Sequence, residues 1–165
     1  MEDWRGEIWE RAELFAAENG RTLIGQLGYG YDGNVFATER QSAIKVLRFQ
    51  RLYERERDVY LRLRSRSIVD VAGFAVPQLI HHDDQLWVVE MGIVSPPFVL
   101  DFAGAYLDRR PDYPNDVMEE WQADKLEQFG EERWETVQRI MAHFARIGIY
   151  LADVKPGNIK FAESD

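Results

Sequence analysis

The sequence has 165 residues, with 29 acidic against 20 basic side chains and no cysteine, so its formal net charge at pH 7 is −9. This charge argues against a general nucleic-acid binder, and the lack of cysteine excludes disulfides and thiolate metal sites. The N-terminus lacks the pattern of a signal peptide and no apolar run approaches the length of a membrane span, so we expect a cytoplasmic protein without membrane contact.

The first predicted element is an amphipathic helix over residues 3–19, because apolar side chains recur there at every third or fourth position. The period then changes to that of strands. We expect three strands, the first two separated by a glycine-rich loop, at residues 22–24, 34–37 and 42–47.

A second helix, rich in Arg and Glu, is predicted over residues 50–66, and a hairpin over residues 77–91. Residues 21–91 would therefore hold five strands and one helix. A hinge is expected from Gly92 to Pro97, and the pattern beyond it is mostly helical. The elements predicted there are helices over residues 116–129 and 131–147 and a short strand over 159–161. We expect three parts, at residues 1–20, 21–91 and 92–165.

Three glycines in the loop, Gly28, Gly30 and Gly33, have the spacing G-x-G-x-x-G. A hairpin that needs positive φ angles would explain them without any ligand. A dinucleotide-binding fingerprint would need a helix directly after the glycines, and a Walker motif would need Gly-Lys-Ser/Thr, and neither follows. What remains is a strand–loop–strand flap whose backbone can approach a triphosphate closely.

Together with Val35, Ala43 and Lys45, these glycines resemble the glycine-rich loop and the V-A-I-K strand of the protein kinase-like family. The resemblance implies that Val35 and Ala43 enclose the adenine ring of ATP and that Lys45 binds its α- and β-phosphates. The alternative explanation of Lys45 is an exposed lysine on a strand.

In this family a glutamate of the following helix holds the lysine. Glu56 is the first candidate, because Val59, Tyr60 and Leu63 follow it on one apolar helix face. Glu54, two residues earlier, is the competing candidate. The segment "LWVVEMGI" also resembles the family, at the strand that leads into the hinge. The resemblance implies that Val89 lies at the back of the adenine pocket and that the backbone from Glu90 to Gly92 faces the edge of the base.

The segment "GIYLADVKPGNIKF" resembles the kinase catalytic loop H-R-D-x-K-x-x-N, with Leu151 and Ala152 in place of the His and Arg. The resemblance implies that Asp153 orients the attacking hydroxyl, that Lys155 neutralises the transferring phosphoryl group, and that Asn158 gives an oxygen to Mg²⁺.

The resemblance covers residues 21–161 and stops before a D-F-G motif, whose aspartate holds Mg²⁺ in the family. Asp165 or Glu163 is a candidate substitute, and an acidic terminus without a metal is the simpler explanation of both. We expect the shortened second lobe to be covered by a protein partner or by a second copy of the chain.

These observations predict an α+β, protein kinase-like two-lobe fold, with a five-stranded antiparallel N-lobe sheet plus a helix, and a minimal, truncated helical C-lobe. The predicted function is ATP binding, with transfer of the γ-phosphoryl group to a hydroxyl as in a Ser/Thr-type kinase. A pseudokinase that binds nucleotide or a partner without catalysis is the alternative. A purely structural module without nucleotide is a third hypothesis, which the glycine loop and Lys45 disfavour.

Overall fold

The computed structural model describes residues 3–163, and the chain divides into two compact units. Unit 1 comprises the chain up to Ser67 together with Pro77–Ile93, and unit 2 comprises Ile68–Val76 and the chain from Val94 onward. None of the helices within residues 3–163 is long and apolar enough to cross a membrane.

Unit 1 contains a five-stranded antiparallel sheet in the order β1-β2-β3-β7-β6. An α+β fold with this sheet is thereby confirmed. The first strand continues through Gly28, so the expected strand at residues 22–24 was too short. The strands are β1 Leu23–Tyr29, β2 Gly33–Thr38, β3 Ser42–Leu47, β6 Leu79–Asp83 and β7 Val88–Gly92.

Helix α1, Trp4–Glu18, covers one face of this sheet. Its N-terminus is capped by Asp3, whose Oδ1 accepts a hydrogen bond of 3.2 Å from the Gly6 N–H. The core that the helix shares with the sheet consists of Ile8, Ala12, Phe15 and Ala16 from α1 and Phe36, Ile44, Val46 and Val88 from the strands.

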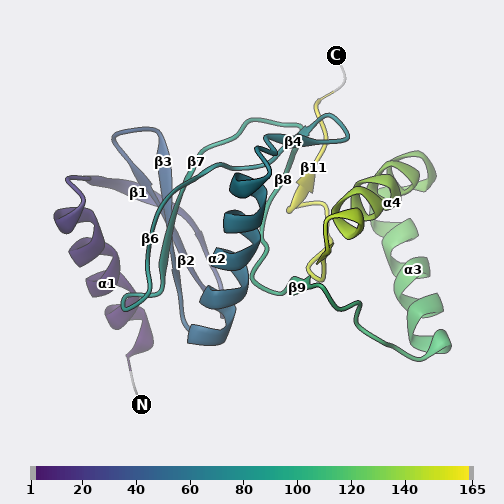
Figure 1. Cartoon of the computed structure of the whole chain (residues 1–165), viewed down its shortest axis with the longest axis horizontal. Helices are drawn as coiled ribbons and strands as arrows, with labels where there is room; N and C mark the ends of the chain where they lie inside the picture. The colour runs from purple at the N-terminus through teal and green to yellow at the C-terminus, as the bar shows by residue number, and fades with distance from the viewer. Residues whose placement is uncertain (1–2, 164–165) are drawn as a thin grey trace. The chain divides into compact units, whose positions relative to one another are not determined.

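Helix α2, Gln50–Ser65, lies on the other face of the sheet, so that the sheet separates the two helices (Figure 1). Successive side chains of a strand point to opposite faces, and Ile44 belongs to the core with α1. Lys45 therefore projects toward α2. The predicted apolar face of α2 is buried through Val59, Tyr60 and Leu63.

Unit 2 contains two helices, α3 Asn115–Phe129 and α4 Glu131–Arg146, which lie side by side (Figure 1). Gly130 separates them with a φ of +80°, a conformation in which glycine is unstrained. Of the two helices, α4 contributes more to the core of unit 2, because its Trp134, Val137, Ile140 and Phe144 are buried, whereas in α3 only Phe129 is buried.

Two small sheets complete unit 2, in the orders β11-β8-β5-β4 and β10-β9. Of their strands, only β11 coincides with a predicted one. A two-residue strand is too short to show an alternating pattern, and each of these forms by pairing with another segment. Their bounds are β4 Asp70–Val71, β5 Phe74–Ala75, β8 Phe98–Val99, β9 Tyr106–Leu107, β10 Ile149–Tyr150 and β11 Ile159–Lys160.

Candidate functional site

The central feature of unit 1 is a buried ion pair between Lys45 and Glu56. The Lys45 ammonium lies 2.9 Å from Oε2 of Glu56 and 3.1 Å from Oε1. The Lys45 side chain is 12% exposed and that of Glu56 is 1% exposed. Glu54, the competing candidate, instead accepts a hydrogen bond of 3.0 Å from Gln50 on the exposed side of α2. Glu56 is therefore the residue that contacts the lysine.

The surroundings of Lys45 are apolar. Strand register places Val35 and Val89 opposite Lys45 on the two neighbouring strands, and Ala43 precedes it by two positions on the same face. Val89 is 0% and Ala43 is 6% exposed. The structure thus gathers the three predicted adenine-pocket residues and the lysine on the α2 face of the sheet.

The fold requires glycine at only one of the three positions of the G-x-G-x-x-G motif. A Cβ atom at Gly33 would lie 2.2 Å from the Val46 carbonyl oxygen, so the close approach of β2 and β3 requires glycine there. A Cβ at Gly28 or Gly30 would meet nothing within 4 Å, and neither has a positive φ. The close packing of β2 against β3 therefore explains the glycine at position 33, but the fold gives no such reason for Gly28 or Gly30. Because the space beside the backbone of Gly28 and Gly30 is open, a ligand can approach that backbone closely.

Glu90 was expected to contribute its backbone, and its side chain has a separate structural role. The side chain is 0% exposed, and its Oε1 accepts hydrogen bonds of 2.7 Å from Arg21 Nε and 2.7 Å from Ser42 Oγ. These contacts hold β7 to β3 and to the start of β1. Sequence reasoning missed Arg21 and Ser42, because no local pattern marks either residue as the partner of a buried carboxylate.

One backbone N–H of the expected hinge already donates a hydrogen bond within the protein. The Gly92 N–H donates a hydrogen bond of 2.9 Å to the Gln78 carbonyl. This donor is therefore not available to a base while that bond exists.

The predicted catalytic loop lies in unit 2, between β10 and β11. Buried Val154 and Ile159 anchor it, and the Asn158 N–H donates to the Lys155 carbonyl at 2.9 Å, which closes the turn at Pro156 and Gly157. The chain thereby folds back so that three polar side chains of the loop meet.

The side chain of Asn158 is hydrogen-bonded to Asp153. The Asn158 amide nitrogen donates hydrogen bonds of 3.0 Å to the Asp153 backbone carbonyl and 3.0 Å to Asp153 Oδ2. The Lys155 ammonium lies 3.6 Å from the same carboxylate oxygen. The Asp153 side chain is 44% exposed, so it is open to a ligand from solvent while the Asn158 amide orients it.

Metal ligands are few in this loop. Among residues 3–163 there is no cluster of three His, Asp or Glu side chains that could hold a metal ion. With its nitrogen bound to Asp153, the Asn158 amide has an oxygen that accepts no hydrogen bond from residues 3–163 and that can act as a single ligand. Glu163 is exposed, and Asp165 lies outside the described residues.

A cavity of about 540 Å³ lies between α3 and α4 and reaches the start of the predicted catalytic loop at Leu151 and Ala152. Its wall is mostly apolar and aromatic, and Trp121 and Trp134 meet edge to face with ring centroids 5.7 Å apart. The Arg110 guanidinium lies 5.6 Å from the Tyr150 ring centroid at this cavity.

No family model matches the chain, and no curated protein matches it. Among the solved structures to which the chain is similar are those of aminoglycoside phosphotransferases. The ADP-bound APH(2'')-Ib has 18% sequence identity and a TM-score of 0.41, over 52% of this chain and 28% of that one. The same four values hold for APH(2")-IIa in its ternary complex with streptomycin and ATP.

A third structure, the gentamicin–APH(2")-IIa complex, is 18% identical with a TM-score of 0.41, and covers 73% of this chain and 36% of that one. The chain thus spans about a third of the length of the structures to which it is similar.

Proposed function

We propose that the chain is an ATP-binding, kinase-like protein that transfers the γ-phosphoryl group of ATP to a hydroxyl acceptor. The observation that carries this proposal is the buried Lys45–Glu56 pair beside two glycines that the fold itself does not require. The buried carboxylate of Glu56 fixes the position of the Lys45 ammonium on an apolar face of the sheet. A positive charge in a fixed position is well suited to bind phosphate oxygens.

In unit 1, Val35, Ala43 and Val89 would enclose the adenine ring, because they form the apolar surface around Lys45. Gly28 and Gly30 would let the backbone approach the phosphates. Lys45 would bind the α- and β-phosphates and Glu56 would hold it in position.

In unit 2, Asp153 would accept a hydrogen bond from the attacking hydroxyl, since its carboxylate is exposed and already oriented by Asn158. Lys155 would neutralise charge on the transferring phosphoryl group. A Mg²⁺ ion, when bound, would neutralise phosphate charge. The Asn158 amide oxygen is the ligand that this loop offers it, so the phosphates would supply most of the coordination.

A nucleotide-binding regulatory protein without catalysis is the second candidate. The apolar cavity between α3 and α4 favours it, because its lining residues Tyr113 and Val117 are 47% and 45% exposed and would be covered by a protein partner or a second copy of the chain. Native mass measured by light scattering over a range of concentrations tests for the second copy.

The first test is a calorimetric titration of ATP into the protein, with and without Mg²⁺, beside the variants Lys45→Ala and Lys160→Ala. Lys160 is an exposed strand lysine and serves as the control. We expect binding that is lost in Lys45→Ala and kept in Lys160→Ala. Equal affinity in Lys45→Ala and the unchanged protein would refute the nucleotide site.

The second test separates catalysis from binding. Asp153→Asn keeps the size of the side chain but removes its charge, so phosphoryl transfer should fall at least a hundredfold while ATP affinity stays the same. Transfer that persists at full rate would mean that Asp153 is not the base. The absence of transfer in the unchanged protein, with ATP bound, would favour the regulatory candidate.

A further inference from the structure

A second cavity of about 660 Å³ lies in unit 1, between the start of α1 and the outer side of the glycine-rich segment. It is on the face of the sheet opposite to Lys45, because Phe36, which belongs to the core with α1, forms part of its wall. The proposed nucleotide site leaves this cavity unexplained. The lining residues are Trp4, Arg5, Trp9, Gln26, Tyr29, Gly30, Tyr31, Asn34 and Phe36.

The walls of this cavity are aromatic and open to solvent. Tyr29 is 83%, Tyr31 68% and Trp9 46% exposed. Trp9 meets Phe36 edge to face, with ring centroids 5.3 Å apart, so one side of the cavity is already ordered. Rings that stand exposed around a hollow offer flat surfaces for stacking, which suits a planar ligand.

Two amide side chains lie among these rings. Asn34 is only 9% exposed, and within residues 3–163 nothing forms a hydrogen bond with its side chain. The Asn34 amide therefore has no partner among these residues that a ligand group would have to displace. Gln26 makes one long contact, 3.5 Å to the Gly28 carbonyl. Each amide offers both a donor and an acceptor, as the edge of a nitrogen heterocycle does.

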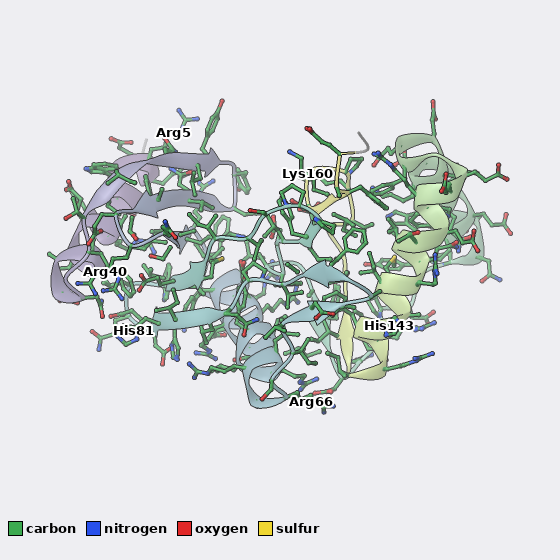
Figure 2. All side chains as sticks on the ribbon, turned by 90° about the horizontal axis from the view of Figure 1, so that it is seen from above. Arg5, Arg40, Arg66, His81, His143 and Lys160 are labelled. Atoms are coloured by element: carbon green, nitrogen blue, oxygen red, sulfur yellow. The ribbon has the colours of Figure 1, made fainter. Side chains whose placement is uncertain are left out.

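Two arginines lie at this cavity. The Arg5 guanidinium lies 5.3 Å from the Trp4 ring centroid, and Arg5 stands at the beginning of α1 (Figure 2). The Arg48 guanidinium lies 4.4 Å from the ring centroids of both Trp4 and Tyr31. None of the described residues that line the cavity is acidic. An anionic group on the ligand would therefore be attracted.

We propose that this cavity binds a planar nitrogen heterocycle that carries an anionic group. The ring stacks on Tyr29, Tyr31 and the tryptophans, Asn34 bonds to its edge, and the arginines attract its charge. The ligand also restrains the glycine-rich loop. The loop is already tied to the end of β3, where the Arg48 N–H donates to the Asp32 carbonyl at 2.7 Å.

The test uses three probes that share this chemistry: nicotinate, guanosine monophosphate and flavin mononucleotide. Each is titrated calorimetrically into the full chain with ATP at a saturating concentration, and into the Lys45→Met variant without ATP. We expect at least one probe to bind with the same affinity in both. Its parent without the anionic group (nicotinamide, guanosine or riboflavin) should bind at least tenfold more weakly. Binding that is lost in a Lys45→Met variant shown by circular dichroism to be folded would place the probe in the proposed nucleotide site and overturn the inference.

Two variants then localise the probe. Asn34→Ala removes the buried amide, and Tyr29→Ala removes a side chain so exposed that folding does not depend on it. Each should lower the affinity at least tenfold, whereas Tyr113→Ala, an exposed tyrosine of unit 2, should not change it. Binding by none of the three probes, full affinity in both variants, or a loss confined to Tyr113→Ala would overturn the inference.

Hydrogen exchange supplies a readout that is independent of any ATP binding. Saturating probe should slow exchange of the backbone amides from Tyr29 to Asn34 at least tenfold, with little change in α2. Probe binding without such protection would refute the restraint of the loop.

Discussion

Arg21 and Glu90 form an ion pair of 2.7 Å between positions 69 residues apart in the sequence, inside a site where Glu90 is 0% exposed. The same Oε1 atom accepts a hydrogen bond from Ser42, whereas Oε2 has no hydrogen bond among the described residues. The carboxylate therefore depends on two donors. Removing the positive one leaves a buried charge that solvent cannot reach.

We predict that Arg21→Met lowers the free energy of unfolding by about 3–5 kcal/mol, the usual cost of leaving a buried charge unpaired. Ser42→Ala removes a hydrogen bond to the same carboxylate, worth about 1.5–3 kcal/mol, and also the 2.6 Å hydrogen bond between the Ser42 and Thr38 hydroxyls, so its cost should be at least that large. Urea denaturation followed by circular dichroism measures both. The control is Arg40→Met, because the Arg40–Glu39 pair is 3.6 Å long and exposed and should contribute less than about 1 kcal/mol. Equal effects of Arg21→Met and Arg40→Met would contradict the burial argument.

The Lys45–Glu56 pair leads to a related prediction with a compensating variant. Lys45→Met removes the ammonium from a carboxylate that is 1% exposed, so we expect a loss of about 3–5 kcal/mol in the free energy of unfolding. Glu56→Gln in the same chain removes the remaining charge and should restore part of that loss. Chemical denaturation of the single and double variants measures the difference. A double variant that is less stable than Lys45→Met would mean that the buried charge is not the cause.

Gly33 and Gly28 should respond differently to the same substitution. Gly33→Ala forces a Cβ toward the Val46 carbonyl, 2.2 Å away before relaxation, and should destabilise by about 1–3 kcal/mol. Gly28→Ala meets open space and should change stability by less than about 1 kcal/mol. If the proposed nucleotide site is right, Gly28→Ala nevertheless weakens ATP binding, because its methyl group occupies the space that the phosphates would use. Thermal unfolding and ATP titration, run side by side, separate the two effects.

The sheet and the long helices could be predicted from the sequence because their patterns are local. Alternation of apolar residues identified β3 to the residue, and the three-to-four-residue repeat identified α1, α2 and α4 within one residue at each end. The grouping of Asp153, Lys155 and Asn158 could also be predicted, because a short turn at Pro156 and Gly157 brings together residues that are already close in sequence.

The parts that could not be predicted depend on distant segments. The strand β5 pairs with β8, 23 residues away at Ala75 and Phe98, and neither carries a pattern of its own. The sequence also left two glutamates open as partners of Lys45. The packing of α2 on the sheet decides between them, since Glu56 is buried against Lys45 whereas Glu54 bonds Gln50 on the exposed side of the helix. The cavity at Asn34 requires α1 to lie over β2, a contact that no local motif indicates.

A last prediction concerns pH and the cluster formed by Tyr53, Asp84 and Arg57. Hydrogen bonds from the Tyr53 hydroxyl, at 2.5 Å, and from Arg57, at 3.1 Å, hold the pKa of Asp84 below its ordinary value of 3.8. His82 also lies 3.3 Å from this carboxylate. A carboxyl group whose pKa is lower in the folded than in the unfolded chain stabilises the fold at pH values above its pKa in the unfolded chain. That contribution disappears as the pH falls through its pKa in the folded chain.

Burial, and then the hydrogen bond to Asp84, raise the pKa of Tyr53 above its ordinary value of 10.0. A group whose pKa is raised by folding stabilises the fold below its unfolded pKa, and the contribution is lost as the pH rises through the folded value. Tyr53→Phe should therefore lower the free energy of unfolding most at pH values between the ordinary pKa of Asp84 and that of Tyr53. Its cost relative to the unchanged protein should shrink below about pH 4 and above about pH 10. Since the Asp84 side chain is 62% exposed, Asp84→Asn should cost no more than about 1 kcal/mol near neutral pH. Urea midpoints measured from pH 3 to pH 11 test both variants, and a difference between Tyr53→Phe and the unchanged protein that stays constant across this range would refute the role of the cluster.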